Sequence, residues 1–128
     1  ECVLMPSGSS WSSNNGLNLI IALDYGGRED IRRSIINIYN KYKKNNIPIE
    51  EISFEEIESN LMTRGIPNPD LIIRTSGEYR ISNFLLWQSA YSEYEFVKCN
   101  WPDFDNRTYL EALKSFEKRD RRFGKLNE

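Results

Sequence analysis

Two arginines and several small hydroxyl residues surround a glycine in the middle of the chain. The stretch reads RTSGEYRISN and runs from Arg74 to Asn83. Guanidinium groups form forked contacts with phosphate or carboxylate oxygens, and a glycine lets the backbone come close to a bound group. Arg74, Arg80 and Ser82 are therefore candidate ligands of an anion, and diphosphate is the first candidate.

The same residues have a purely structural alternative. In this alternative the two arginines pair with Glu78 or Asp70, and Ser82 caps the helix that we expect to follow. A short pattern of this kind is not specific by itself, so both interpretations stay open at this point.

Three further features combine a chemical candidate with an ordinary alternative. The GGR stretch, Gly26 to Arg28, either contacts phosphate or forms a plain turn with a solvated arginine, and a lone Gly-Gly pair favours the turn. Glu93 either ligates Mg²⁺, which prefers carboxylate and phosphate oxygens, or is an edge carboxylate. The basic cluster EKRDRRFGK is either a solvated helix end or a group that reaches an anion on a partner chain.

Composition excludes several classes of function. The chain has 128 residues, of which 39% are hydrophobic, a formal net charge of -2 and no histidine. Histidine-based triads and histidine-ligated zinc are thereby excluded, and we expect no nucleic-acid partner. The two cysteines, Cys2 and Cys99, lie far apart in the sequence and form no metal-binding motif. This suits a protein of the reducing cytoplasm better than a scaffold of disulfides. No transmembrane segment or signal peptide is recognisable, so we expect a soluble cytoplasmic chain.

Short apolar runs alternate with stretches of helical apolar spacing. Residues 1–16 are rich in Ser, Asn and Gly, so we expect a disordered linker or a cloning remnant there and a folded domain over residues 17–128. The remaining pattern predicts an α/β fold with a parallel sheet and flanking helices. Ligands of parallel sheets bind at the carboxyl ends of the strands, where Arg74 ends a predicted strand. The predicted strands are 17–23, 71–74 and 94–99. The predicted helices follow Gly27, Ser53 and Ser82, and the last one begins at Arg107. Ser53 to Glu56 have the form of a capping box, with a hydroxyl at the cap and a glutamate three residues later.

Several long motifs in the second half of the chain resemble one known family. PDLIIRTSGEYRISNFLLWQSAYSEYEF, then WPDF and RRFG, are similar to the carboxyl-terminal signature of the cis-prenyltransferases, the family of undecaprenyl diphosphate synthase (isoprenyl transferase). IALDYGGREDI resembles a mid-chain segment of the same family. The likeness begins near Leu17 and is far more specific than any short pattern, because its motifs are long and occur in order.

The resemblance implies a transferase that condenses isopentenyl diphosphate with an allylic diphosphate such as farnesyl diphosphate. The product would be a polyprenyl diphosphate, which in bacteria becomes the lipid carrier of cell-wall sugars. It further implies the carboxyl-terminal part of the undecaprenyl diphosphate synthase fold, Mg²⁺ as cofactor, a homodimer, and contact with a membrane surface for the lipid product.

Site residues carried over from this resemblance fall into three groups. Arg74, Arg80 and Ser82 match the family residues that hold the isopentenyl diphosphate, Glu78 matches a neighbouring motif glutamate, and Glu93 matches a carboxylate linked to the metal. The residues that match a carboxyl-terminal motif reaching the other subunit's site are Arg122, Phe123 and Gly124.

The chain also departs from the family pattern. Members carry an Asp-Gly-Asn-Gly-Arg loop whose aspartate is central to catalysis, and nothing in this sequence matches it. We therefore expect a carboxyl-terminal half that is inactive alone and has no catalytic residue of its own. The alternative is a non-catalytic partner subunit of a heteromeric enzyme. Tyr79 stands where relatives often have His or Gln.

Overall fold

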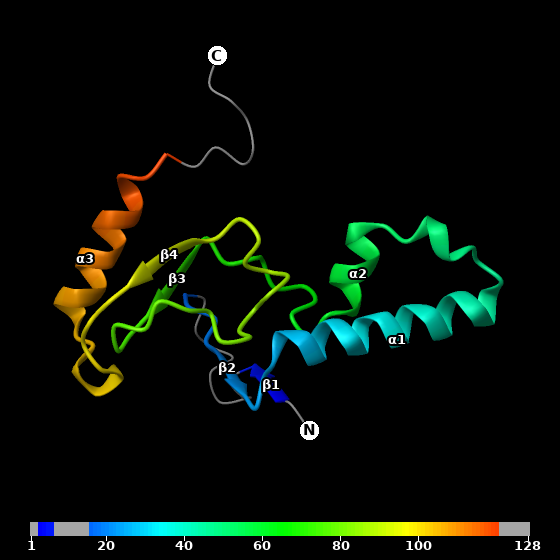
Figure 1. The fold of residues 1–128 in the computed structure, drawn as a ribbon, viewed down its shortest axis with the longest axis horizontal. Helices are drawn as coiled ribbons and strands as arrows, with labels where there is room; N and C mark the ends of the chain where they lie inside the picture. Colours follow the sequence, from blue (N-terminus) through cyan, green and yellow to red (C-terminus); the bar gives the residue numbers. More distant parts are fainter. Residues whose placement is uncertain (1–2, 7–15, 121–128) are drawn as a thin grey trace, which may run out of the picture. The chain divides into compact units, whose positions relative to one another are not determined.

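The protein is described by a computed structural model that covers residues 3–6 and 16–120. These residues form two compact units (Figure 1). The first unit comprises Glu1–Pro67 together with Asn83–Leu85, and the second comprises Asn68–Ser82 together with Leu86–Glu128. Within the described ranges, no helix is both long and apolar enough to cross a membrane.

In the first unit, two short strands pair in antiparallel orientation. Strand β1 (Val3–Pro6) lies opposite β2 (Ile20–Leu23). We expected residues 1–16 to be a linker without regular structure, and for the four residues of β1 this expectation is wrong. Residues 7–15 lie outside the described part of the chain.

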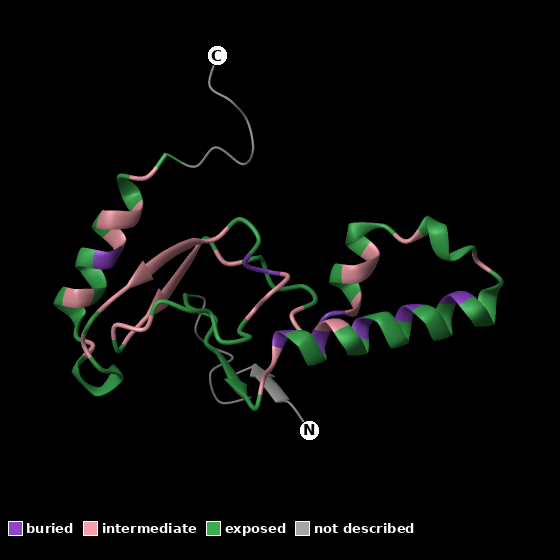
Figure 2. Ribbon diagram, in the orientation of Figure 1, coloured by how far each residue is buried: buried purple, intermediate pink, exposed green. Residues whose placement is uncertain are grey.

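Helix α1 (Gly27–Asn45) begins at the second of the two glycines that were predicted to lead into a helix. Its buried face carries Asp30, Ser34, Ile38 and Tyr42, which recur every four residues (Figure 2). Two apolar residues of the same helix, Ile35 and Tyr39, are instead more than half exposed. The buried face of α1 thus mixes polar and apolar side chains.

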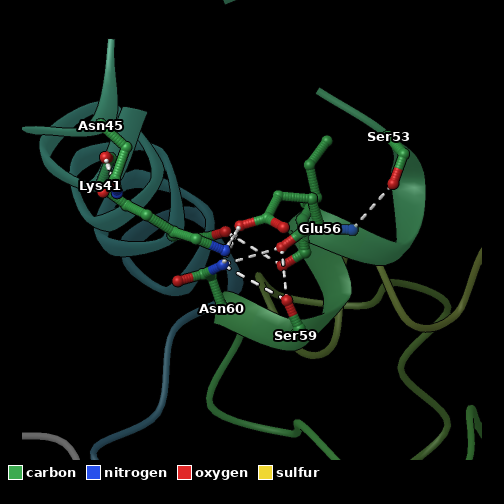
Figure 3. Close-up of polar contacts among 8 residues, drawn as sticks. Lys41, Asn45, Ser53, Glu56, Ser59 and Asn60 are labelled. Carbon is green, nitrogen blue, oxygen red and sulfur yellow. Dashed lines mark hydrogen bonds and ion pairs between the residues drawn. The ribbon is translucent and has the colours of Figure 1, made fainter. Parts of the chain in front are cut away.

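Helix α2 (Phe54–Asn60) begins at the predicted capping box, after a short 3-10 turn, η1 (Ile49–Glu51). The Ser53 hydroxyl accepts a hydrogen bond of 3.2 Å from the backbone amide of Glu56 (Figure 3). Lys41 of α1 pairs with the same Glu56 at 2.9 Å, and Ser34 donates a 3.1 Å hydrogen bond to the carbonyl of Ile57. Polar contacts therefore accompany the packing of α1 on α2.

In the second unit, β3 (Leu71–Arg74) and β4 (Glu93–Phe96) form a parallel pair. Helix α3 (Asn106–Glu117) packs on β4 after a 3-10 turn, η2 (Trp101–Asp103). The prediction of an α/β fold with a parallel sheet and flanking helices is confirmed, with Arg74 at the carboxyl end of its strand.

The helix predicted after Ser82 is absent from the structure, which has turns over residues 82–91. Ser82, Asn83 and Leu85 have φ angles of 46°, 64° and 47°, which a right-handed helix cannot contain. Asn83 instead caps α1: its carbonyl accepts from the amide of Gly27 at 2.7 Å, and its side-chain oxygen accepts from the amide of Arg28 at 2.9 Å. This distant cap explains the departure from helical geometry, since Gly26 has no side chain to cap α1 itself.

Candidate functional site

The loop that leaves β3 at Arg74 is fixed to the segment that follows β4. The amide of Ser76 donates to the carbonyl of Cys99 at 2.7 Å, and the amide of Gly77 donates to the carbonyl of Val97 at 2.9 Å. In return, the amide of Val97 donates to the carbonyl of Arg74 at 2.8 Å. These three backbone bonds give the loop a defined path at the carboxyl end of the sheet.

Two residues of this loop have left-handed backbone conformations. Ser76 has a φ of 68° and Gly77 a φ of 63°. We expected Gly77 to let amide groups face an anion, but the amides of Ser76 and Gly77 both donate to carbonyls of the protein. These two amides are therefore engaged within the protein, and the donors that remain at the loop are side chains.

The structure brings Arg74, Glu78 and Arg80 together on the loop. Arg74 Nη1 donates a 2.6 Å hydrogen bond to the carbonyl of Arg80, while Arg80 Nη1 pairs with Glu78 Oε2. The Arg80 side chain is 61% exposed and that of Glu78 is 41% exposed, so their ion pair lies at the surface. The structural alternative of an arginine paired with Glu78 is thus realised, in a form that leaves the guanidinium accessible.

Ser82 and Tyr79 flank this cluster. Because residues 82–91 form turns, Ser82 does not cap a following helix. Tyr79 is 71% exposed as a residue, and the centroid of its ring lies 5.2 Å from that of Phe96 on β4. Tyr79 therefore packs against the strand beside the arginines.

The GGR stretch, for which phosphate contact was one of two alternatives, lies at the amino-terminal end of α1. The amides of Gly27 and Arg28 both have a protein partner, because Asn83 accepts from each of them. A plain turn capped by Asn83 accounts for the GGR stretch.

Glu93 begins β4 and pairs with Arg119, a residue of the basic cluster EKRDRRFGK. Arg119 Nη1 lies 3.1 Å from Glu93 Oε2, and Arg119 Nη2 pairs with Glu95 Oε2. Glutamates two apart on a strand share a face, and this spacing is visible in the sequence. Their common partner, Arg119, lies 24 residues or more from them along the chain. The role of Arg119 was therefore missed.

Within residues 3–6 and 16–120, no group of three or more Cys, Asp or Glu side chains is placed to hold a metal ion. Glu93 is held by a guanidinium, and this positive charge would repel a divalent cation at the same carboxylate. The observed arrangement does not fit Glu93 as a metal ligand while Arg119 occupies it. Arg122, Phe123 and Gly124 lie outside the described residues.

Comparison with known proteins gives consistent results. Residues 6–124 match the family model described as "Putative undecaprenyl diphosphate synthase". An isoprenyl transferase of Agrobacterium fabrum is 49% identical over 117 residues, covering 91% of this chain and 47% of the relative. An isoprenyl transferase of Clostridium acetobutylicum is 51% identical over 115 residues, covering 88% of this chain and 45% of the relative.

Solved structures show the same relationship. A lavandulyl diphosphate synthase from Lavandula x intermedia, solved with dimethylallyl diphosphate, has a TM-score of 0.77 and 40% identity, covering 80% of this chain and 44% of that one. A probable undecaprenyl diphosphate synthase from Campylobacter jejuni has a TM-score of 0.65 and 31% identity, covering 80% and 45%.

The chain spans about half the length of the curated relatives that it matches. The family model nevertheless covers most of the chain and includes the loop with Arg74 and Arg80. The chain belongs to the undecaprenyl diphosphate synthase family of prenyltransferases.

Proposed function

We propose that this chain supplies the isopentenyl diphosphate site of a cis-prenyltransferase. The whole enzyme would condense isopentenyl diphosphate with an allylic diphosphate such as farnesyl diphosphate and form a polyprenyl diphosphate. The observation that carries the proposal is the loop at the carboxyl end of β3, where Arg74 and Arg80 lie together on a backbone fixed by three hydrogen bonds.

The charges of this loop suit an incoming diphosphate. Arg80 is engaged by Glu78 in an exposed ion pair, and such pairs stabilise proteins by only ~0–1 kcal/mol. Charge-assisted hydrogen bonds to phosphate contribute about 1.5–3 kcal/mol each, so a diphosphate can replace Glu78 as the partner of Arg80. Ser82 adds a hydroxyl two residues further along the chain.

The arginines would bind and orient the substrate without moving a proton. In prenyl transfer, the allylic carbon–oxygen bond breaks, diphosphate leaves, the double bond of isopentenyl diphosphate attacks the allylic carbon, and the product alkene forms by loss of a proton. A guanidinium stays protonated, so neither Arg74 nor Arg80 can be the base. Their role is to hold the double bond of the attacking substrate in place through its diphosphate.

Magnesium, a homodimer and a cytoplasmic location complete the proposal. Bound Mg²⁺ would neutralise diphosphate oxygens, and Glu93 would be a ligand only after release from Arg119. Arg122, Phe123 and Gly124 would act at the site of a second subunit. A membrane surface in contact with the enzyme would receive the lipid product.

The proposal can be tested by titrating the 128-residue chain with isopentenyl diphosphate in a calorimeter. We expect binding that is weaker by about 10-fold or more in Arg80→Ala. Arg107→Ala is the matched control, because Arg107 also forms an exposed ion pair, with Glu111 on α3. Equal binding by the chain and by Arg80→Ala would contradict the proposal.

Transfer is tested separately with radiolabelled isopentenyl diphosphate, farnesyl diphosphate and Mg²⁺. We expect the 128-residue chain alone to incorporate no label, because the aspartate loop of the family has no counterpart in its sequence. Incorporation by this chain would refute the expectation. Binding without transfer in the full-length protein would instead favour the partner-subunit alternative.

A further inference from the structure

Two carboxylates of β4 converge on a single guanidinium. Arg119 Nη1 donates to Glu93 Oε2 at 3.1 Å and to the carbonyl of Tyr94 at 2.8 Å. Arg119 Nη2 donates to Glu95 Oε2 and to Ser115 Oγ, the latter at 3.3 Å. The guanidinium is therefore surrounded by oxygen atoms from both β4 and α3.

This cluster is more enclosed than the other arginine–glutamate pair of α3. The side chains of Arg119, Glu93 and Glu95 are 28%, 32% and 23% exposed. The pair of Arg107 and Glu111 is 85% and 64% exposed. Ion pairs shielded from water and supported by extra hydrogen bonds are held more firmly than exposed ones, so the Arg119 cluster has the features of an anchor.

The alternation of β4 explains why both carboxylates reach the same arginine. Residues two apart on a strand project to the same face, so Glu93 and Glu95 share one face. Tyr94 and Phe96 share the other face, where their rings stack with centroids 6.0 Å apart. Ser115 of α3 completes the cluster by donating a 2.9 Å hydrogen bond to Glu95 Oε2.

Arg119 lies just beyond the carboxyl end of α3, so its contacts connect this end of the helix to β4. Helix α3 ends at Glu117, and Arg119 lies two residues beyond it, where its backbone amide donates a 3.0 Å hydrogen bond to the carbonyl of Phe116. Its guanidinium ties this point of the chain to the beginning of β4. The residues that follow include Arg122, Phe123 and Gly124.

We propose that Arg119 is a positioning residue that holds the carboxyl end of α3 on β4. Arg119 occupies the carboxylates of Glu93 and Glu95, so a divalent cation and Arg119 exclude each other at these oxygens. The inference is independent of the proposed substrate, because it concerns only contacts within the chain.

The test measures a distance, since stability alone would not separate positioning from folding. Spin labels are attached at Lys98→Cys and Lys118→Cys, two exposed positions just after β4 and α3, in a chain whose Cys2 and Cys99 are replaced by serine. Electron–electron double resonance then reports the distance between the end of α3 and the end of β4. Circular dichroism confirms that each variant is folded.

We expect one narrow distance distribution in the labelled parent and a broad, shifted one in Arg119→Met. Arg119→Lys should restore the distance only in part, because an ammonium group cannot reproduce the fork that contacts both glutamates. Arg107→Met, which removes the exposed pair of the same helix, should leave the distribution unchanged. An unchanged distribution in folded Arg119→Met would overturn the proposal.

Two further measurements keep the proposal testable if Arg119→Met does not fold. Glu93→Gln and Glu95→Gln each remove one ion pair while keeping the side-chain shape, and both should broaden the distribution; no broadening in either variant contradicts the anchor. Millimolar Mg²⁺ in the absence of a diphosphate should leave the parent distribution unchanged, because the proposed magnesium site includes diphosphate oxygens as well as Glu93. If Mg²⁺ reproduces the distribution of the glutamine variants, the cation displaces Arg119 and the anchor is not the resting state.

Discussion

The side chain of Arg74 donates a 2.6 Å hydrogen bond to the backbone carbonyl of Arg80. One arginine of the candidate site therefore braces the backbone that carries the other. The two residues are not equivalent: loss of Arg74 removes a cation and loosens the loop, whereas loss of Arg80 removes a cation and its pairing with Glu78.

Arg74→Ala should weaken isopentenyl diphosphate binding more than Arg80→Ala does. Each change removes a charge-assisted contact, for which a loss of about 10-fold or more in affinity is expected. Arg74→Ala should add a further loss because the backbone of Arg80 is no longer held. Calorimetric titration of the full-length protein measures both, with farnesyl diphosphate as the comparison ligand. Equal losses for the two diphosphates would argue against a site specific for isopentenyl diphosphate.

Gly26→Ala and Asn83→Gly should destabilise the protein in a coupled way. A Cβ atom on Gly26 would lie 2.8 Å from Nδ2 of the Asn83 side chain, so alanine displaces the side chain that caps α1. Each single change should cost about 1 kcal/mol, the usual value of a helix cap. The double variant should cost less than the sum, because the cap is lost only once. Urea unfolding measures the cycle.

The matched control for this cycle is Gly16→Ala, since a Cβ atom there would have no neighbour within 4 Å. It should be additive with Asn83→Gly. Full additivity of Gly26→Ala with Asn83→Gly would show that the two residues do not act through one cap.

The cap that Asn83 forms on α1 shows which part of the fold was predictable from sequence. Helix α1 and the Ser53 cap of α2 are local features, and both were predicted correctly. The apolar residues after Ser82 also have helical spacing, yet Asn83 caps a helix 55 residues earlier and adopts a left-handed conformation. Local periodicity carries no information about such a distant partner, so the predicted helix was wrong.

The candidate site shows the same division. Arg74 could be placed at the carboxyl end of a strand because an apolar run and a turn are both local signals. The pairing of Glu93 with Arg119 depends on the packing of α3 against β4, which no spacing in the sequence specifies. Glu93 as a metal ligand remains a prediction, and the structure adds the condition that Arg119 must leave it.

Asp30→Ala should destabilise the first unit strongly. Asp30 is 1% exposed and accepts hydrogen bonds from the amide of Met62 at 2.8 Å and from the hydroxyl of Tyr25 at 2.9 Å. Alanine leaves these donors without this acceptor, at a cost of about 3 kcal/mol. Glu29→Ala is the control, because Glu29 is the neighbouring acidic residue and its exposed carboxylate pairs with Arg32 of the same helix. The midpoint of urea unfolding should be lower in Asp30→Ala than in the parent and nearly unchanged in Glu29→Ala. Similar midpoints in the two variants would contradict a stabilising role of the buried Asp30 carboxylate.

Acid should weaken α3 through Asp105. Hydrogen bonds from the backbone amide of Thr108, and next from its hydroxyl, lower the pKa of Asp105 below its ordinary value of 3.8. A lowered pKa in the folded state means that the cap stabilises fully above the unfolded pKa and is lost as pH falls through the folded pKa. The loss should therefore begin near pH 4 and continue below it.

Asp105→Asn isolates this contribution, because asparagine also caps helices but does not titrate. Thermal unfolding followed by circular dichroism should show a smaller decline in melting temperature for Asp105→Asn than for the parent below that pH. Parallel declines in the two proteins would show that Asp105 does not contribute to the acid sensitivity.

The proposed dimer predicts recovery of activity when two inactive full-length variants are mixed. One variant carries Arg80→Ala and the other Arg122→Ala. If the carboxyl-terminal motif acts on the site of the partner subunit, a heterodimer has one site with both arginines intact and one site with both lost. Activity should then return on mixing, in proportion to the heterodimer formed. If subunit exchange is demonstrated and no activity returns, Arg122 acts within its own chain or has no part in the site.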